Sequence, residues 1–166
     1  MKRVALALAV LCVPTLAQAR AWKSVSPGNT PIAEVTKRFG EPTTKLKRGK
    51  QTVYAYEQDE AIAGTTQAQF IVGPQGTVEQ IAVFPASVID KAAIEATYGP
   101  DCALKPGGNC FLRKVSDESF KTYYWYASTG LVVFFTKDGK AAESFLYVKP
   151  ERQQASGQGQ KSSDAR

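Results

Sequence analysis

The sequence predicts an α+β fold made of two tandem helix-β-β-β units, with the short helices packed on one face of an antiparallel sheet. Two observations support this prediction. Helix signals occur twice, over residues 30–40 and 87–99, and an alternating strand and a hairpin follow each of them. Because helices on one side cover only one face of such a sheet, we expect the other face to stay open.

The first helix signal has a clear beginning and end. Thr30 is a good N-cap, Pro31 suits the first helical position, and Gly40 with a nearby proline stops the helix. Apolar residues at helical spacing give this segment one apolar face, formed by Ile32, Val35 and Phe39.

The second helix signal repeats the arrangement. Ser87 and Asp90 form an imperfect capping box, and Gly99 followed by proline ends the segment. Ile94 and Tyr98 mark its apolar face. Repetition of the same start and stop signals indicates an internal duplication.

Each helix is followed by strand signals. An aromatic residue at every second position predicts a strand over residues 52–57 and another over residues 122–127. A hairpin with a Gly-containing turn then closes each unit. Its strands are expected over residues 69–72 and 78–84 in the first unit, and over residues 131–135 and 142–148 in the second.

The chain begins with the layout of a cleavable secretory signal, residues 1–19. A basic start is followed by an apolar run too short to span a bilayer and by a small-residue triplet that ends at Ala19. We therefore expect a periplasmic or secreted protein. Lipidation at Cys12 is the less favoured alternative, because the preceding residue, Leu11, is not small.

The remaining boundaries follow from these signals. The two units are assigned to residues 20–86 and 87–150. Residues 151–166 are rich in Gln, Ser and Gly and are expected to be a disordered tail. The formal net charge of +6 falls to +4 once the two basic residues of the signal, Lys2 and Arg3, are removed. This charge is mild.

Two cysteines remain after export. Cys102 and Cys110 flank a turn-rich loop and are expected to form a disulfide in an oxidising compartment. A metal site is less favoured, because the chain has no histidine. Within the loop, Lys105 and Asn109 are candidate partner-binding residues.

Basic residues concentrate between the first helix and the first strand signal. Such a loop could meet phosphates, anionic lipid or an acidic partner, but a solvated loop is the favoured interpretation because interleaved aromatics are missing. We expect no nucleic-acid partner and at most peripheral membrane contact. The residues are Lys45, Lys47, Arg48 and Lys50.

The face of the sheet away from the helices is the predicted partner site. On the second aromatic strand, Tyr123 and Trp125 point to that face, and large aromatics are enriched at protein interfaces. The alternative is that the first unit, the tail or the segment around Trp22 covers this face. Residues predicted for the opposite, helix-covered face are Tyr54, Tyr56, Phe120, Thr122, Tyr124 and Tyr126.

Few residues suggest catalysis. No histidine is available to activate a serine, and no phosphate-binding or dinucleotide-binding motif occurs, so no cofactor is expected. The one acidic cluster comprises Glu57, Asp59 and Glu60, and a solvated loop is favoured over a carboxylate-dependent hydrolase.

The helix that ends in Phe39-Gly40-Glu41-Pro42, followed by a Tyr-rich strand and a hairpin, resembles the SmpA/OmlA (BamE-like) envelope proteins. The second junction, Tyr98-Gly99-Pro100, matches more loosely, and the two-copy layout is similar to the β-lactamase inhibitor protein. This resemblance implies a non-catalytic, exported protein-binding module, such as a cell-envelope scaffold or assembly component. The alternative that it implies is a secreted inhibitor of an extracellular enzyme.

Overall fold

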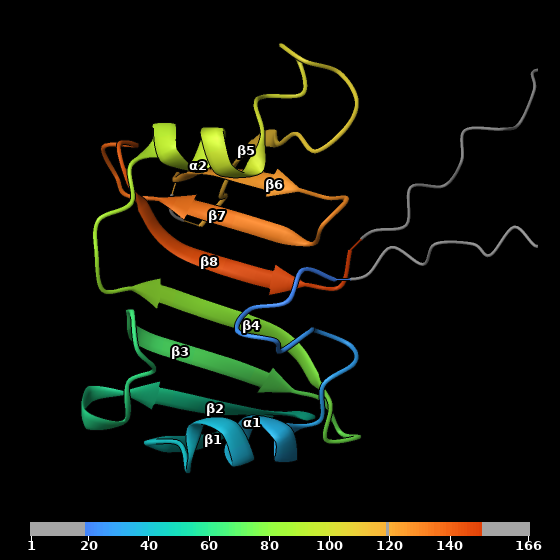
Figure 1. Cartoon of the computed structure of the whole chain (residues 1–166), viewed down its shortest axis with the longest axis vertical. Coiled ribbons are helices and arrows are strands. Elements are labelled where there is room, and N and C mark those ends of the chain that lie inside the picture. Colours follow the sequence, from blue (N-terminus) through green and yellow to red (C-terminus); the bar gives the residue numbers. More distant parts are fainter. Residues whose placement is uncertain (1–18, 119, 151–166) are drawn as a thin grey trace, which may run out of the picture.

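The computed structural model describes residues 19–118 and 120–150. Its strands form one antiparallel eight-stranded sheet in the order β1-β2-β3-β4-β8-β7-β6-β5 (Figure 1). The first half of the chain contains α1 (Ile32–Phe39), β1 (Thr44–Arg48), β2 (Gln51–Glu57), the 3₁₀ turn η1 (Gln58–Glu60), β3 (Thr65–Val72) and β4 (Val78–Pro85). The second half contains α2 (Lys91–Tyr98), β5 (Leu112–Val115), β6 (Thr122–Tyr126), β7 (Leu131–Phe135) and β8 (Ala142–Val148).

The predicted fold class is wrong. Within residues 19–118 and 120–150 the eight-stranded sheet dominates and only two α-helices of eight residues each occur, rather than helix-packed units of three strands. The two strands that the prediction lacks are β1 and β5, which form the two edges of the sheet. All their residues are exposed, so neither strand carries the apolar alternation by which a strand is recognised in a sequence.

The two halves meet at the centre of the sheet, where β4 pairs with β8. Gln80 to Val83 lie opposite Phe145 to Val148. On either side of this seam, four consecutive strands form an antiparallel meander that begins at the outer edge. The predicted secretory signal up to residue 18 and the predicted tail, residues 151–166, lie outside the described residues.

One face of the sheet carries the core and both helices. The Phe39 ring of α1 packs on Tyr56 and Phe70, with ring centroids 6.3 and 6.0 Å away. The Tyr98 ring of α2 packs on Tyr126 and Phe145 at 5.8 and 6.5 Å. The strand register places these partners on the same face, called here the helix face.

Burial separates the residues predicted for this face. Tyr56, Tyr124 and Tyr126 are fully buried, and Tyr54 is partly buried beside them. Phe120 does not belong to the core, because it precedes β6 with a φ of 51° and is 86% exposed. Its predicted place on the helix face is therefore wrong.

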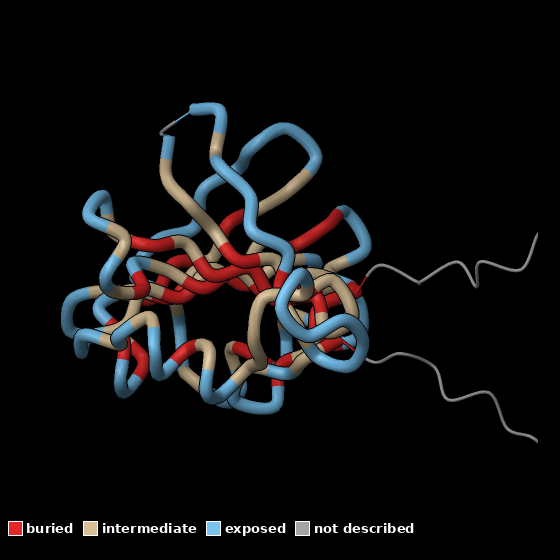
Figure 2. The backbone as a smooth tube through the Cα atoms, turned by 90° about the horizontal axis from the view of Figure 1, so that it is seen from above, coloured by how far each residue is buried: buried red, intermediate tan, exposed pale blue. Residues whose placement is uncertain are grey.

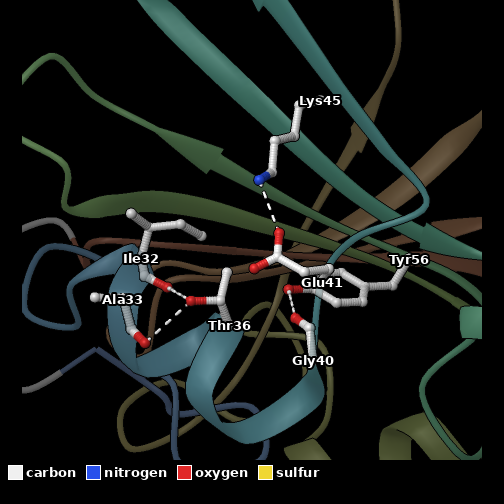
Figure 3. A network of polar contacts seen from close by, with 7 residues as sticks. All are labelled: Ile32, Ala33, Thr36, Gly40, Glu41, Lys45 and Tyr56. Atoms are coloured by element: carbon white, nitrogen blue, oxygen red, sulfur yellow. Dashed lines mark hydrogen bonds and ion pairs between the residues drawn. The ribbon is translucent and has the colours of Figure 1, made fainter.

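Each helix end is tied to the sheet by an equivalent hydrogen bond. The Tyr56 hydroxyl donates to the Gly40 carbonyl at 3.0 Å (Figure 3), and the Tyr126 hydroxyl donates to the Gly99 carbonyl at 3.2 Å. In each half, the second strand therefore holds the residue that ends the preceding helix. This shared contact is the closest structural counterpart of the sequence repeat.

The helices begin one or more residues later than their sequence signals. Pro31 rather than Thr30 directly precedes α1. The Thr30 hydroxyl does not cap the helix; it accepts a hydrogen bond from the Ser26 amide instead. Asp90 precedes α2, and its side chain makes no cap hydrogen bond. Among the described residues, no helix is long and apolar enough to cross a bilayer.

Candidate functional site

The face opposite the helices, called here the open face, differs strongly between the two halves. One row of paired residues crosses all eight strands on this face. From β1 to β4 the row consists of small or polar side chains, and from β8 to β5 it consists of larger apolar ones. In spatial order the row is Thr44, Ala55, Gln69, Ala82, Leu146, Val132, Trp125 and Leu112.

Aromatic side chains gather on the second half of the open face. The Tyr123 and Phe134 rings lie side by side across β6 and β7, with centroids 5.2 Å apart. Next to them, the Lys114 ammonium lies 3.8 Å from the centroid of the Trp125 ring, a cation–π geometry. Tyr123, Phe134 and Trp125 are all partly exposed and lie outside the buried core cluster.

The predicted disulfide is confirmed: Cys102 and Cys110 are bonded, with their Cα atoms 5.1 Å apart. Backbone hydrogen bonds fix both ends of the loop. The Cys102 amide donates to the Phe111 carbonyl, and the Phe111 amide donates to the Pro100 carbonyl. Because the Phe111 ring stacks on Tyr124 at 3.5 Å, the loop is anchored in the core at the point where β5 begins.

A cavity of about 290 Å³ lies between this loop and the open face. The disulfide and the glycines Gly107 and Gly108 line one side of it. Leu112 and Trp125, which pair across β5 and β6, line the other. The structure therefore brings together two features that the sequence offered separately, the disulfide loop and Trp125.

Exposed large apolar residues concentrate in the chain segment that contains the disulfide loop, β5 and the β5–β6 connection; Leu112 lines the cavity, and Val115 lies on the other face of the same edge strand. Six such residues occur among the described residues, and four of them lie between positions 104 and 120. Phe120 stands out, because a positive φ is strained for a bulky side chain and such strain is concentrated at functional sites. We call this region the β5 surface; it comprises Leu104, Leu112, Val115, Phe120 and Trp125.

In Figure 2 the ends of β5 and β6, found on either side of the short grey stretch, project away from the body of the molecule. The neighbouring tube is mostly exposed, whereas the strands in the middle of the view are buried. The tip of the β5–β6 hairpin is thus presented away from the core.

The other predicted loop residues take different positions. Asn109 is exposed, and its side-chain amide donates to the Tyr98 carbonyl at the end of α2. Lys105 is exposed at the middle of the loop. Asn109 thus holds the loop against α2, while Lys105 extends the β5 surface with a positive charge.

The predicted basic loop is largely the edge strand β1. Lys45 pairs with Glu41 at 2.8 Å (Figure 3). Its ammonium also lies 5.6 Å from the centroid of the Tyr54 ring. The hydrogen bond that the Lys45 ammonium donates to the Glu41 carboxylate raises the pKa of Lys45. Among the described residues, Lys47, Arg48 and Lys50 make no ion pair.

The predicted acidic cluster is split by the structure. Glu57, at the end of β2, accepts a hydrogen bond from Gln67 at 2.6 Å. Asp59 and Glu60 are exposed in η1. Within the part of the chain that the structure describes, no group of three acidic or cysteine side chains could hold a metal ion.

Comparison with known proteins gives a likeness of fold. No protein-family model matches the chain, and no curated protein matches it. Among solved structures, it is similar to a DUF4309 family protein, YjgB, from Bacillus subtilis, with a TM-score of 0.52 and 16% identity over 76% of this chain and 84% of that chain. A cysteine-rich secretory protein from Staphylococcus aureus has a TM-score of 0.42 and 12% identity over 72% of this chain and 42% of its own. Neither structure is an SmpA/OmlA protein or a β-lactamase inhibitor protein, so that resemblance stays a prediction.

Proposed function

We propose that the chain is an exported, non-catalytic module that binds another protein through the β5 surface. The observation that carries this proposal is the cavity lined by Leu112 and Trp125, at the sheet edge where four of the six exposed large apolar residues of the described chain occur. Isolated exposed apolar residues are ordinary, but their concentration along one sheet edge that also carries a cavity is typical of an interaction site.

The arrangement has the elements of an interface centre. Trp125 offers a large flat surface whose position is set by pairing with Leu112 and by the cation above its ring. A partner side chain in the cavity would contact both Trp125 and the disulfide, and the exposed residues around it would exclude water. Fully desolvated aromatic contacts of this kind account for most of the energy of protein interfaces.

The charges next to the β5 surface favour a partner that is itself mainly apolar at the contact. Arg113 and Lys121 are already neutralised by Asp101 and Glu143. Lys114 is placed over Trp125, and Lys105 is exposed in the disulfide loop. A cell-envelope scaffold or assembly component fits this surface and the predicted secretory signal, and a disulfide is typical of extracytoplasmic proteins.

Site-specific photo-crosslinking tests the proposal. We would introduce p-benzoylphenylalanine at Phe120 or at Leu112, and as a matched control at Val88, which is 81% exposed on the β4–α2 connection. The purified, oxidised protein would be incubated with envelope and culture-fluid fractions of its source. We expect the same protein to be captured from both β5-surface positions and not from Val88.

Trp125→Ala supplies a second arm. Combined with the probe at Phe120, this change should remove most of the capture while the fold persists, because Trp125 is only partly buried. Its cost in stability should stay below the roughly 3–5 kcal/mol of a fully buried aromatic truncation. Equal capture at Val88, no capture at either β5-surface position, or a product that contains only a second copy of this chain would refute the proposal.

A further inference from the structure

A second cavity lies on the helix face, over the seam where the two halves meet. Its volume is about 360 Å³, within the range of small-molecule sites. Residues from both halves line it: Val83 and Pro85 come from β4, and Phe145 and Tyr147 from β8. We call it the seam cavity.

The fold itself leaves this space. Each helix has only eight residues, about 12 Å of length, and packs over its own half of the sheet. The centre of the helix face therefore depends on the segment that precedes α1 for cover, and Figure 1 shows that segment, in blue, crossing β4 between the two helices. Trp22 of this segment packs on Phe70 at 5.9 Å and forms one wall of the cavity.

Next to the cavity, the covering segment contains a strained turn. Trp22 and Val25 exchange backbone hydrogen bonds of 2.9 Å in both directions, and the two residues between them, Lys23 and Ser24, have φ angles of 46° and 67°. Such turns ordinarily use Asn or Gly, because other residues are strained at positive φ. The Arg38 side chain of α1 holds the turn by donating to the Lys23 carbonyl at 2.6 Å.

This turn places a positive charge at the cavity. Lys23 lines it, with its ammonium 5.8 Å from the centroid of the Trp22 ring. A second cation lies close by, because the Arg20 guanidinium is 4.6 Å from the centroid of the Tyr98 ring, which also lines the cavity. No ion pair among the described residues involves Lys23 or Arg20.

A phenol hydroxyl completes the polar part of the site. Tyr147 is 7% exposed, lines the cavity, and has no side-chain hydrogen bond within the described part of the chain. Every fully buried side-chain oxygen or nitrogen among the described residues has a hydrogen-bond partner. The Tyr147 hydroxyl, which has none, is therefore not fully enclosed by protein atoms, and its side chain lines the cavity. Burial raises the pKa of Tyr147, so this hydroxyl remains a hydrogen-bond donor at neutral pH.

We propose that the seam cavity binds a small amphipathic carboxylate, with its apolar body against Trp22, Ile89 and Phe145 and its carboxylate toward Lys23 and Tyr147. Apolar walls with a few convergent donors are the usual design of small-molecule sites. The charges match an anion, because the cations next to the cavity have no acidic partner in the described chain. This proposal is independent of protein binding at the β5 surface, which lies at the outer edge of the sheet, away from the seam.

Octanoate is the probe for the test. The chain has two tryptophans, Trp22 in the seam cavity and Trp125 in the cavity on the open face, so the indole N–H signals of the folded protein report the two cavities in one NMR spectrum. We expect octanoate to shift the Trp22 signal saturably and to leave the Trp125 signal in place. No shift of Trp22, or equal shifts of both signals, would overturn the proposal.

Two variants and a neutral probe sharpen the result. Lys23→Gln should weaken octanoate binding about three- to fivefold, the effect of losing a partly exposed ion pair, and leave binding of uncharged octanol unchanged. Ala63→Phe, at an exposed loop position that lines the cavity, should fill it and abolish binding of both compounds. Octanol binding as tight as octanoate, or undiminished octanoate binding by a folded Ala63→Phe variant, would contradict the proposal. If the Ala63→Phe variant does not fold, the octanoate-induced shift of the Trp22 signal and the effect of Lys23→Gln on octanoate affinity still test the proposal.

Discussion

Removal of one hydroxyl from the Tyr56 side chain tests how the helix is held on the sheet. In Tyr56→Phe the ring keeps its edge-on contacts with Phe70 and Phe39, at 5.6 and 6.3 Å, because only the hydroxyl is lost. The hydrogen bond to the Gly40 carbonyl disappears (Figure 3). The change therefore isolates the polar tie between β2 and the end of α1.

The magnitude follows from the surroundings of the two groups. A neutral hydrogen bond contributes about 0.5–1.5 kcal/mol net to the free energy of unfolding. Gly40 is exposed, so its carbonyl regains water when the tyrosine hydroxyl is absent, which places the expected loss at about 0.5–1 kcal/mol. For a chain of this size that corresponds to a melting temperature lower by roughly 2–5 °C.

Urea unfolding followed by circular dichroism measures this loss. The matched control is Tyr54→Phe, because the Tyr54 hydroxyl makes no hydrogen bond within the described residues, and its stability should equal that of the parent chain. Tyr126→Phe should cost about as much as Tyr56→Phe, and the double variant should lose the sum within about 0.5 kcal/mol, because the two sites share no partner. The reasoning fails if Tyr56→Phe is no less stable than Tyr54→Phe.

The same residue predicts how stability responds to alkaline pH. Burial raises the pKa of Tyr56 to about 12, whereas a tyrosine in an unfolded chain titrates near pH 10. The unfolded state therefore loses its proton first, so the stabilisation from this group is complete below about pH 10 and is lost between pH 10 and 12. Over this interval the parent chain should lose more stability than Tyr56→Phe, so the gap between them should close.

Two further changes test the second half of the molecule. Replacing both Cys102 and Cys110 by serine should reduce the free energy of unfolding by about 2–3 kcal/mol, measured against the oxidised parent in urea, and should weaken photo-capture at Phe120, since the disulfide lines the cavity beside Trp125. An unchanged unfolding midpoint would show that the loop adds nothing to stability. Gly99→Ala should cost more than Gly40→Ala, because an added Cβ would lie 1.9 Å from the Asn109 carbonyl oxygen whereas Gly40 has open space around it. The positive φ at both positions costs about 1–3 kcal/mol by itself, so equal losses in thermal melts would show that the crowding at Gly99 is relieved without cost.

The six inner strands could be predicted from the sequence, and the reason lies in their burial. Most of them alternate buried side chains on the helix face with more exposed ones, as in Ala68, Phe70 and Val72 of β3; β2, which also buries Val53 and Ala55 on the open face, is recognised by its alternating tyrosines. This alternation is a direct record of one-sided burial. The strands β1 and β5 leave no such record, because their side chains are exposed on both faces, and the prediction therefore assigned three strands to each unit instead of four.

The candidate site was only partly accessible to sequence reasoning. The alternation along β6 gave the orientation of Trp125, and the spacing of the cysteines gave the disulfide. The cavity between them depends on the pairing of Leu112 with Trp125, which requires the unrecognised strand β5. Phe120 was assigned to the helix face because the alternation of β6 was extended backwards beyond its first residue, Thr122. At Phe120 the backbone has a positive φ and no longer follows the strand.

The outermost strands have a consequence for the solution behaviour of the protein. A sheet with two unpaired margins could in principle grow by lateral addition of further copies, as in fibrous aggregates. Both margins here carry cations without an ion pair in the described chain, Lys47 and Arg48 on one side and Lys114 on the other. A neighbouring molecule that approaches either side meets like charge, and this repulsion reaches about 8 Å at physiological ionic strength but only about 3 Å at 1 M salt. We therefore expect the cations of these two short strands to disfavour edge-to-edge assembly into ribbons, and this protection to weaken at high salt.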